Sequence, residues 1–331
     1  MKEIRREEII NYSGNLRMLD GLVPYLRENY VYVEKNQSLA GDAPKLFIRR
    51  YEYGLAKKKN PKNWPAYIAK VGHKWYPVES IMEQLLTDLG KLYGLSIADS
   101  TLAIASGQLR FLSRYFLEKD ERLMHGAEIY AAYLNEDISF VDEIESEQLS
   151  SVFFTVNFTY ESFKSLFQSN YDELFCDLIR MLTFDALTGN NDRHFYNWGV
   201  VTDIQNIKPP RFAPIYDTAR ALFWNFSDSK IENFTEQKER ILKYGTRSKP
   251  KMGIERRNNL NHFQFIQEIF ERFPDHRHFV TSLIERVSKI NESQLIDTEY
   301  RYLLSKSRRR LIVDCLYFRK VALLEIARKY D

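Results

Sequence analysis

Residues 189–197 read Gly-Asn-Asn-Asp-Arg-His-Phe-Tyr-Asn, and residues 215–217 read Ile-Tyr-Asp. Asp192 and Asn197 stand five positions apart, which is the spacing between the base aspartate and the metal-binding asparagine in the catalytic loop of protein kinases. Asp217 follows twenty residues after Asn197 and would be a second metal ligand. The pattern predicts a phosphotransferase site.

The residue types suit phosphoryl transfer from ATP. The reaction needs an acceptor hydroxyl held in line and a means of neutralising the charge on the phosphates. A carboxylate such as that of Asp192 can orient the hydroxyl, while the amide and carboxylate oxygens of Asn197 and Asp217 are ligands that Mg²⁺ prefers. We therefore expect Mg²⁺ to bind at Asn197 and Asp217.

The segments around this motif predict a helix followed by a hairpin. Residues 171–187 have a helical apolar pattern, and Gly189 allows the chain to turn out of that helix. Strands are expected at 198–201 and 211–215, with turn residues over 203–210 between them. Such a hairpin would bring the two metal ligands together. Asp, Asn and His are also common in ordinary polar loops, so this interpretation depends on features elsewhere in the chain.

The rest of the chain predicts two lobes. Short strands are expected at residues 30–33, 46–50, 66–70, 103–104 and 110–116, with an amphipathic helix over 78–92. Helical patterns cover residues 261–273, 278–290 and 300–330, and the polar segment 228–258 is expected to be a loop. The predicted fold class is α+β, a bilobal protein-kinase-like fold with a small β-rich N-lobe (residues 1–120) and a larger, mainly helical C-lobe (residues 121–331).

Lys70 ends an apolar strand, where kinases carry a lysine that contacts the α- and β-phosphates and pairs with a helix glutamate. Glu79 and Glu83, one turn apart on the following helix, are the available partners. The alternative is a solvated lysine at a strand end, but strand, helix and catalytic loop follow one another in the order found in kinases. Upstream, residues 38–45 form a loop of small residues whose backbone amides could approach phosphates, with Lys45 adding charge.

Together these stretches resemble the HipA family of bacterial serine/threonine kinases, the toxin components of toxin–antitoxin pairs. The phosphate loop of the family is matched by Ser38, Gly41 and Lys45, its strand lysine by Lys70, and its helix glutamate by Glu83 with Gly94 eleven residues on, a better fit than Glu79. The catalytic run is matched by Asn190, Asp192, Arg193, His194 and Asn197, and the metal motif by Pro214, Tyr216 and Asp217.

The resemblance implies roles for these residues. Asp192 would orient or deprotonate the acceptor hydroxyl, and Asn197, Asp217 and Lys70 would complete the catalytic set. The expected Mg²⁺–ATP site consists of Ser38, Gly41, Lys45, Lys70, Glu83, His194, Asn197 and Asp217. The resemblance also implies autophosphorylation at Ser38, a growth-inhibiting action on a translation factor or aminoacyl-tRNA synthetase, and a helix-turn-helix antitoxin as partner.

The chain departs from the family pattern in three places. Ser38 lies close to the start, so we interpret the chain as a short form that lacks most of the N-terminal subdomain. Thr218-Ala219 replaces the Phe-Gly that follows the metal aspartate in protein kinases, and Asp42 introduces a negative charge near the expected phosphates.

Two alternative functions remain. One is a non-enzymatic nucleotide- or partner-binding member of the fold. The other is a phosphoinositide-type lipid kinase, because those enzymes share the Asp-Arg-His-x-x-Asn run.

Composition narrows the function classes. The 331 residues are 44% hydrophobic with a net charge of +3, which supports a folded core and carries no signature of direct nucleic-acid binding. No apolar run reaches the ~20 residues of a membrane span, and the charged N-terminus is unlike a signal peptide. Cys176 and Cys315 lie in apolar helical patterns without zinc-binding spacing, so a reducing cytoplasm is expected.

Overall fold

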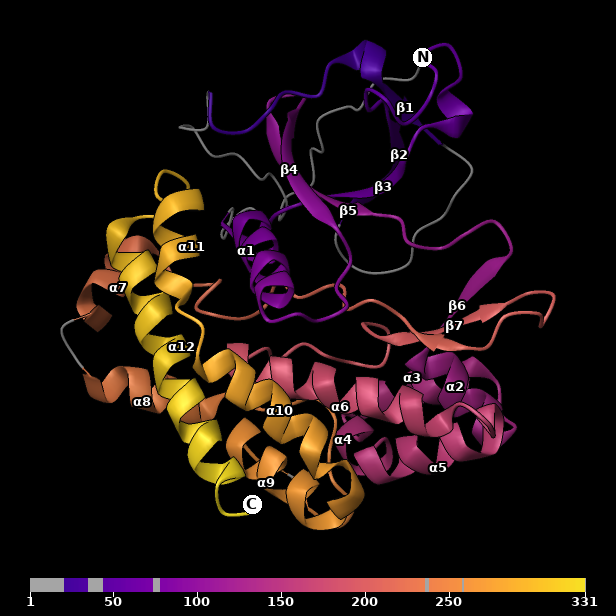
Figure 1. Ribbon diagram of the computed structural model, residues 1–331, viewed down its shortest axis with the longest axis vertical. Coiled ribbons are helices and arrows are strands. Elements are labelled where there is room, and N and C mark those ends of the chain that lie inside the picture. The colour runs from indigo at the N-terminus through magenta and orange to yellow at the C-terminus, as the bar shows by residue number, and fades with distance from the viewer. Residues whose placement is uncertain (1–20, 35–43, 74–77, 236–237, 258, 331) are drawn as a thin grey trace.

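Five antiparallel strands form the sheet of the N-lobe, in the order β1-β2-β3-β5-β4 (Figure 1). The computed structural model of the chain describes residues 21–34, 44–73, 78–235, 238–257 and 259–330. The strands are β1 (Val31–Val33), β2 (Lys45–Arg50), β3 (Ala66–Val71), β4 (Ser100–Ala105) and β5 (Gln108–Arg114), and the short 3-10 helices η1 (Glu28–Tyr30) and η2 (Pro61–Asn63) lie in the connections. Each expected strand of this lobe is present.

The register of the sheet sets the direction of two lysines. Lys45 is opposite Lys70 in the β2–β3 pair, and Lys70 is opposite Phe111 in the β3–β5 pair. Because directly paired residues point to the same face, these three side chains share one side of the sheet. Ala69 and Leu112 face the other side, where they belong to a separate small apolar cluster.

Helix α1 (Glu79–Leu92) packs against β4 and β5. Its apolar stripe is fully buried and includes Ile81, Met82, Leu85, Leu86 and Leu89. Beyond α1, the Tyr93 hydroxyl donates to Glu292 at 2.8 Å, and within the helix Asp88 accepts from Tyr300 at 2.5 Å. Contacts with both lobes therefore hold α1, the helix that carries Glu79 and Glu83, in place.

A second, three-stranded sheet begins the C-lobe, in the order β6-β7-β8. Its strands are β6 (Glu121–His125), β7 (Gly199–Asp203) and β8 (Arg211–Phe212). The expected hairpin of β7 and β8 is present, with Val200 opposite Phe212. We propose residue 120 as the boundary between the lobes, because β5 belongs to the first sheet and β6 to the second.

The predicted strand over 211–215 is wrong beyond residue 212. Ala213 still donates to Gly199, but the next residues leave β7 and cross to the N-lobe, where Ile215 bridges Ile97 in parallel. The Ile215 amide donates to Ser96 at 2.8 Å and its carbonyl accepts from Ala98 at 2.9 Å. Pro214 has no amide hydrogen to continue the ladder, which is consistent with the change of partner. This crossing carries Asp217 to the junction of the lobes.

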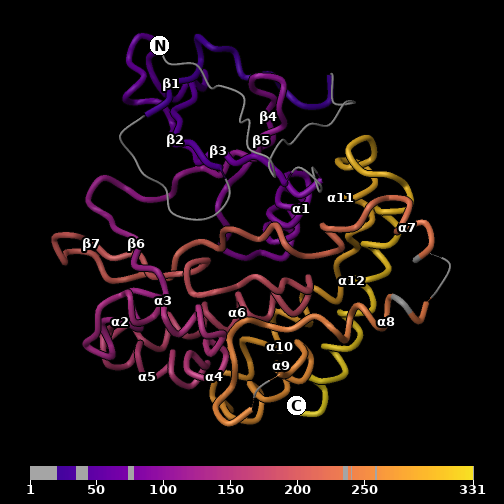
Figure 2. The backbone as a smooth tube through the Cα atoms, turned by 180° about the vertical axis from the view of Figure 1, so that it is seen from behind, coloured from indigo at the N-terminus to yellow at the C-terminus, as the bar shows by residue number. Residues whose placement is uncertain are grey.

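Helices make up the rest of the C-lobe (Figure 2). They are α2 (Gly126–Leu134), α3 (Ile138–Ser146), α4 (Ser150–Phe153), α5 (Val156–Phe167), α6 (Tyr171–Thr188), α7 (Asp228–Thr235), α8 (Lys238–Arg247), α9 (His262–Arg272), α10 (Arg277–Ser288), α11 (Glu292–Glu299) and α12 (Lys306–Ala327), with the 3-10 helix η3 (Pro274–His276) before α10. The described part of the chain contains no helix long and apolar enough to cross a membrane. The α+β, two-lobed fold class is confirmed.

Two helical expectations need correction. The loop expected over 228–258 is wrong, because this segment includes α7 and α8, which bury Ile231 and Ile241 against the core. The single helix expected over 300–330 starts only at Lys306, where the Ser305 hydroxyl caps it by accepting from the Arg308 amide. The shorter helix α11 precedes it.

Candidate active site

Helix α6 leads to the candidate catalytic loop, residues 190–198, at the junction of the lobes. It ends at Thr188, and Gly189 takes the left-handed conformation with φ of 75°. A Cβ at Gly189 would lie 3.1 Å from the Arg319 guanidinium, so both the backbone angle and the space favour glycine. The chain then turns sharply into residues 190–198, as the sequence predicted.

Buried Arg193 ties three segments together. It forms a two-pronged ion pair with Asp185 of α6, with Nε 2.9 Å from Oδ2 and Nη2 3.0 Å from Oδ1. Its Nη1 donates to the backbone oxygens of Asn197 at 2.7 Å and Tyr216 at 2.6 Å. The residues that precede Asp217 and the loop that carries Asn197 are therefore held by one guanidinium, which is 2% exposed. Sequence reasoning overlooked Asp185, although a lone acid in an apolar helical run was a usable signal.

The loop leaves polar atoms of Asp192 and Asn197 exposed to the site. Asn197 Nδ2 donates to the Asp192 backbone oxygen at 2.8 Å, so its Oδ1 is left to accept or to bind a cation. The Asp192 amide donates to Asn190 Oδ1 at 3.1 Å, which fixes the start of the loop. Burial raises the pKa of the Asp192 carboxyl, against the opposing charge of Arg220.

Lys70 joins the lobes through two carboxylates. Its Nζ lies 2.8 Å from Glu83 Oε1 and 2.9 Å from Asp217 Oδ1. Burial alone would lower the pKa of Lys70, but Asp217 and Glu83 together outweigh it and raise that pKa. Burial would likewise raise the pKa of Asp217, yet Lys70 above all, with Lys45 and Arg193, lowers it to about 2. Asp217 is thus a firmly ionised carboxylate.

The backbone at Asp217 is unusual for a residue with a side chain. Its φ is 54°, in the left-handed region that aspartate tolerates better than most residues. This conformation turns the chain directly after the bridge to the N-lobe. A strained backbone conformation persists only where surrounding contacts hold it. Such positions concentrate at functional sites.

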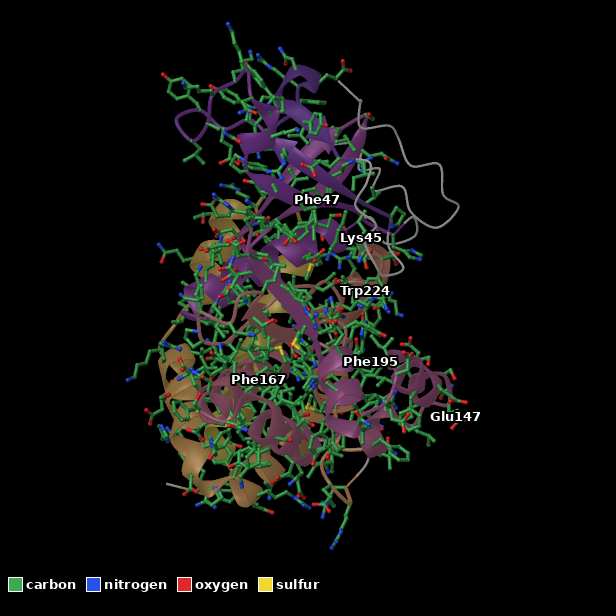
Figure 3. The ribbon with its side chains drawn as sticks, turned by 90° about the vertical axis from the view of Figure 1, so that its right-hand side faces the viewer. Lys45, Phe47, Glu147, Phe167, Phe195 and Trp224 are labelled. Carbon is green, nitrogen blue, oxygen red and sulfur yellow. The ribbon has the colours of Figure 1, made fainter. Side chains whose placement is uncertain are left out.

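Arg220 is a second residue that sequence reasoning overlooked. Its Nη1 lies 3.3 Å from Asp192 Oδ2 and its Nε 4.0 Å from Glu79 Oε1, and the guanidinium lies over the Trp224 ring. Glu79 therefore faces Arg220, and Glu83 faces Lys70. Lys45 and Trp224 lie on the N-lobe and C-lobe sides of the same junction (Figure 3).

His194 is in the loop but oriented by its neighbour. Its Nδ1 accepts from the Tyr196 amide at 3.2 Å. Burial lowers the pKa of His194 despite the nearby carboxylates of Asp192 and Asp217, so the neutral ring is favoured. Ser38 and Gly41, with Asp42, lie outside the described residues. The other expected site residues, from Lys45 to Asp217, gather around the lobe junction.

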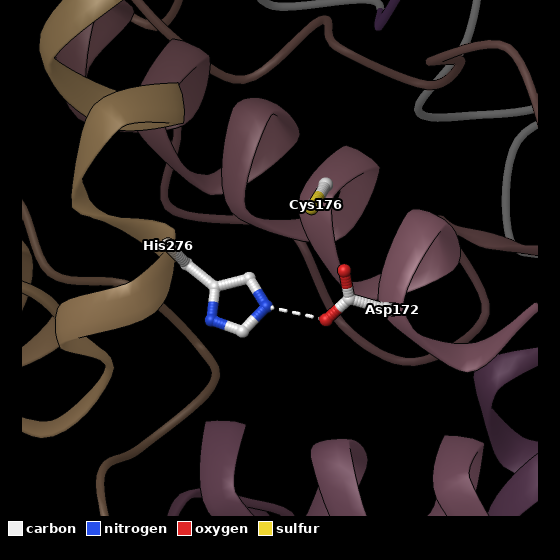
Figure 4. A group of neighbouring side chains, drawn as sticks. All are labelled: Asp172, Cys176 and His276. Carbon is white, nitrogen blue, oxygen red and sulfur yellow. Dashed lines mark hydrogen bonds and ion pairs between the residues drawn. The ribbon is translucent and has the colours of Figure 1, made fainter.

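A second group of polar side chains lies at the opposite end of α6. Asp172, Cys176 and His276 each place one potential ligand atom within 4.8 Å of the others, and His276 Nε2 lies 2.9 Å from Asp172 Oδ1 (Figure 4). Their spacing in the sequence indicated no metal site, because His276 comes from a distant helix. At ~1.5 Å per residue, α6 separates this group from the catalytic loop by roughly 25 Å. Burial raises the pKa of Cys176 to about 12, which favours the neutral thiol.

Two lobes that are joined by a lysine–carboxylate cluster beside a polar loop are typical of a kinase-like fold. The chain belongs to the HipA-like C-terminal domain family, whose model matches residues 37–293. The resemblance inferred from the sequence motifs is therefore confirmed. A search of curated proteins finds no match.

Two solved structures show the same fold. The Helicobacter pylori proinflammatory kinase CtkA is similar with a TM-score of 0.70 at 15% identity, over 92% of this chain and 98% of that one. The Shewanella oneidensis toxin HipA, solved in a complex with HipB and operator DNA, has a TM-score of 0.50 at 15% identity, over 89% of this chain and 65% of that one. At this identity the likeness is one of fold.

Proposed function

We propose that the chain is a HipA-type serine/threonine protein kinase that transfers the ATP γ-phosphate to a protein hydroxyl. The observation that carries this proposal is the contact of Lys70 with both Glu83 and Asp217. Protein kinases need both the ion pair between this lysine and a helix glutamate and a correctly placed metal-binding aspartate before phosphate transfer. The family and the fold of the two solved relatives support the same reaction class.

The donor set fits Mg²⁺ and a nucleotide phosphate chain. Asp217 and the Oδ1 of Asn197 are oxygen ligands of the kind that a hard cation prefers. Lys45 and Lys70, opposite each other on one face of the sheet, would hold the phosphates. When bound, Mg²⁺–ATP would supply the phosphoryl group and the charge neutralisation for its transfer.

Each protein residue then has a defined task. Asp192 accepts a hydrogen bond from the acceptor hydroxyl and takes its proton, since it lies in the loop with its carboxylate directed at the junction. Arg220 contacts one oxygen of Asp192, Oδ2, so the other oxygen is available to the hydroxyl. Arg193 and Asp185 orient the loop from within the C-lobe. Glu83 holds Lys70 toward the phosphates.

ATP affinity is expected to depend on the charge of Glu83. Burial raises the pKa of Glu83 to about 7, against the attraction of Lys70. As the pH falls, Glu83 takes up a proton and no longer holds Lys70 as an ion pair. We expect ATP binding to weaken by about threefold to tenfold between about pH 8 and about pH 6, measured by isothermal titration calorimetry.

Glu83→Gln is the control for this pH dependence. ATP itself titrates equally in both measurements, so the difference between the two chains isolates Glu83. The variant is expected to bind more weakly at the higher pH and to change less with pH than the intact chain. Equal pH dependence in both chains would contradict the assignment.

The acceptor class is tested with γ-labelled ATP. We expect label to appear on a protein when the chain is incubated with a bacterial extract and Mg²⁺, and none on vesicles that contain phosphoinositides. Label on the lipid would favour the phosphoinositide-kinase alternative. ATP binding without label on any acceptor would favour the non-enzymatic alternative.

Ser38 is proposed as a site of autophosphorylation, by family likeness and because it begins the expected phosphate loop. After incubation with Mg²⁺ and ATP, mass spectrometry is expected to find phosphate on the peptide that contains Ser38. A Ser38→Ala chain is the control, and the same peptide from that chain should carry none. Phosphorylation of another protein with no phosphate at Ser38 would contradict the switch.

The biological setting is proposed on family grounds. The Shewanella oneidensis relative is described as part of a toxin–antitoxin system with HipB and operator DNA. We infer a growth-inhibiting toxin that works in the cytoplasm on a translation factor or aminoacyl-tRNA synthetase, with a helix-turn-helix antitoxin as partner. Two free buried cysteines are consistent with a reducing compartment.

A further inference from the structure

A cavity of about 290 Å³, lined by both polar and apolar residues, lies in the C-lobe. One wall comes from the end of α3 and the start of α4, with Glu145 and Ser150. The other comes from the connection between α8 and α9, with Lys249, Lys251 and Arg257. We call this cavity the basic groove, because these three cations face a single glutamate among its charged lining residues.

The basic groove continues toward the catalytic residues. A narrow cavity next to it is lined by Arg193 and His194 and shares Glu145, Ser150 and Lys251 with the groove. Lys251 is therefore at the point where the two meet. Its charge is also among those that act on Asp192 and His194. A chain segment in the groove would therefore lie next to the loop that carries Asp192.

The three cations of the basic groove differ in whether they have a hydrogen-bond or ion-pair partner. Lys249 donates to the neutral Asn259 Oδ1 at 2.7 Å, and Arg257 pairs with Glu268 at 3.2 Å. Lys251 is exposed and has no hydrogen bond or ion pair to any described residue. Glu145 accepts a hydrogen bond from Ser150. Lys249, Lys251 and Glu145 together therefore leave a net positive charge for a ligand.

Backbone contacts hold the wall of the basic groove that contains Gly253. Gly253 bridges Thr155, and its carbonyl accepts from the Val156 amide at 3.0 Å. A Cβ at Gly253 would lie 1.8 Å from the Ser151 carbonyl oxygen, so no other residue fits there without movement of the backbone. This close backbone contact holds the part of the wall around Gly253 in place without a ligand, which lowers the ordering cost of binding.

We propose that the basic groove binds an acidic segment of the protein acceptor and so selects hydroxyls that have aspartate or glutamate residues nearby in the sequence. This inference rests on the proposed kinase function and adds its substrate class. Carboxylates are complementary to Lys249 and Lys251, and the polar lining can pair with the peptide backbone. Lys251 then contacts the bound segment where the groove meets the cavity beside the catalytic loop.

Peptide binding tests the groove without requiring catalysis. The probes are two fluorescein-labelled serine peptides of equal length, one flanked by glutamates and one by lysines, and the readout is fluorescence anisotropy with the full chain. We expect the acidic peptide to bind at least about tenfold more tightly than the basic one. Lys251→Glu combined with Lys249→Glu should weaken the acidic peptide by about tenfold or more, and Lys329→Glu, at an exposed lysine just beyond the end of α12, should not.

Several results would overturn the proposal. These are equal binding of the two peptides, unchanged binding by the Lys249/Lys251 double variant, or displacement of the acidic peptide by oligouridylate at lower concentration, which would identify a nucleic-acid surface instead. Thermal unfolding of each variant separates loss of binding from loss of fold. A single Lys251→Gln variant, which keeps a polar side chain and removes the charge, should also weaken binding of the acidic peptide.

Kinetics distinguish failure of the groove from failure of the kinase. With dephosphorylated casein as an acidic acceptor, the single variant Lys249→Glu should raise KM for casein with kcat and ATP affinity unchanged, since Lys249 lines the groove but not the cavity beside the catalytic loop. A lowered kcat at constant KM would overturn the groove. Peptide binding that follows the expected pattern, together with no transfer to any acceptor, would contradict the proposed kinase and leave the groove as a peptide-binding site.

Discussion

An Asp217→Asn variant is expected to transfer phosphate at least about a thousandfold more slowly than the intact chain, a barrier increase of about 4 kcal/mol. Asp217 is the ionised carboxylate at the lobe junction, with its pKa lowered to about 2, and it contacts Lys70 at 2.9 Å. Asparagine removes the negative charge that would bind Mg²⁺ but keeps the size of the side chain. It also tolerates the φ of 54° at this position.

The measurement is the initial rate of transfer from labelled ATP, with the melting temperature recorded for each chain. Asp275→Asn is the matched control, because Asp275 is exposed in η3 and far from the junction. The control should keep the full rate. Transfer by Asp217→Asn within about tenfold of the intact chain would exclude Asp217 as an essential metal ligand.

The largest effect on stability is expected from Asp185→Ala. The variant leaves the Arg193 guanidinium buried without its carboxylate, and breaking a buried ion pair in this way costs about 3–5 kcal/mol in the free energy of unfolding. The arginine would keep only its two bonds to the backbone oxygens of Asn197 and Tyr216. Urea unfolding followed by circular dichroism measures the loss.

Asp177→Ala is the control on the same helix. Asp177 pairs with Arg180 at 2.6 Å, but both side chains are more than a third exposed, so about 0–1 kcal/mol is expected. Replacing both members of the buried pair, with Arg193→Met added to Asp185→Ala, should recover part of the lost stability, because no unpaired charge remains. A loss below about 1 kcal/mol for Asp185→Ala alone would show that Arg193 does not depend on this carboxylate.

The parts of the site that follow from local sequence could be predicted. Gly189 ends the helix, the polar run follows it, and the hairpin returns the chain, all within about thirty residues, where spacing translates directly into position. Lys70 and Glu83 are also close in sequence and belong to a strand–helix unit. The α+β, two-lobed fold follows from the same periodicities and was confirmed.

Contacts between distant segments could not be predicted in this way. The contacts of Arg193 with Asp185 and of Arg220 with Asp192 depend on how α6, the loop after it and the segment around Asp217 pack, and no periodicity encodes that packing. The exit of residue 215 from the hairpin to pair with Ile97 depends on the position of the other lobe. The helices within residues 228–258 were not predicted because the segment has few apolar residues, so no helical period stands out. Its charged residues are nevertheless good helix formers.

The central claim is phosphate transfer that depends on the catalytic loop. The most direct measurement incubates the intact chain and Asp192→Ala with γ-labelled ATP, Mg²⁺ and bacterial extract, after calorimetry has shown that both chains bind ATP. The account predicts labelled protein with the intact chain and label reduced by at least about a hundredfold with Asp192→Ala. Equal labelling by both chains, or no labelling by an intact chain that binds ATP, would contradict it.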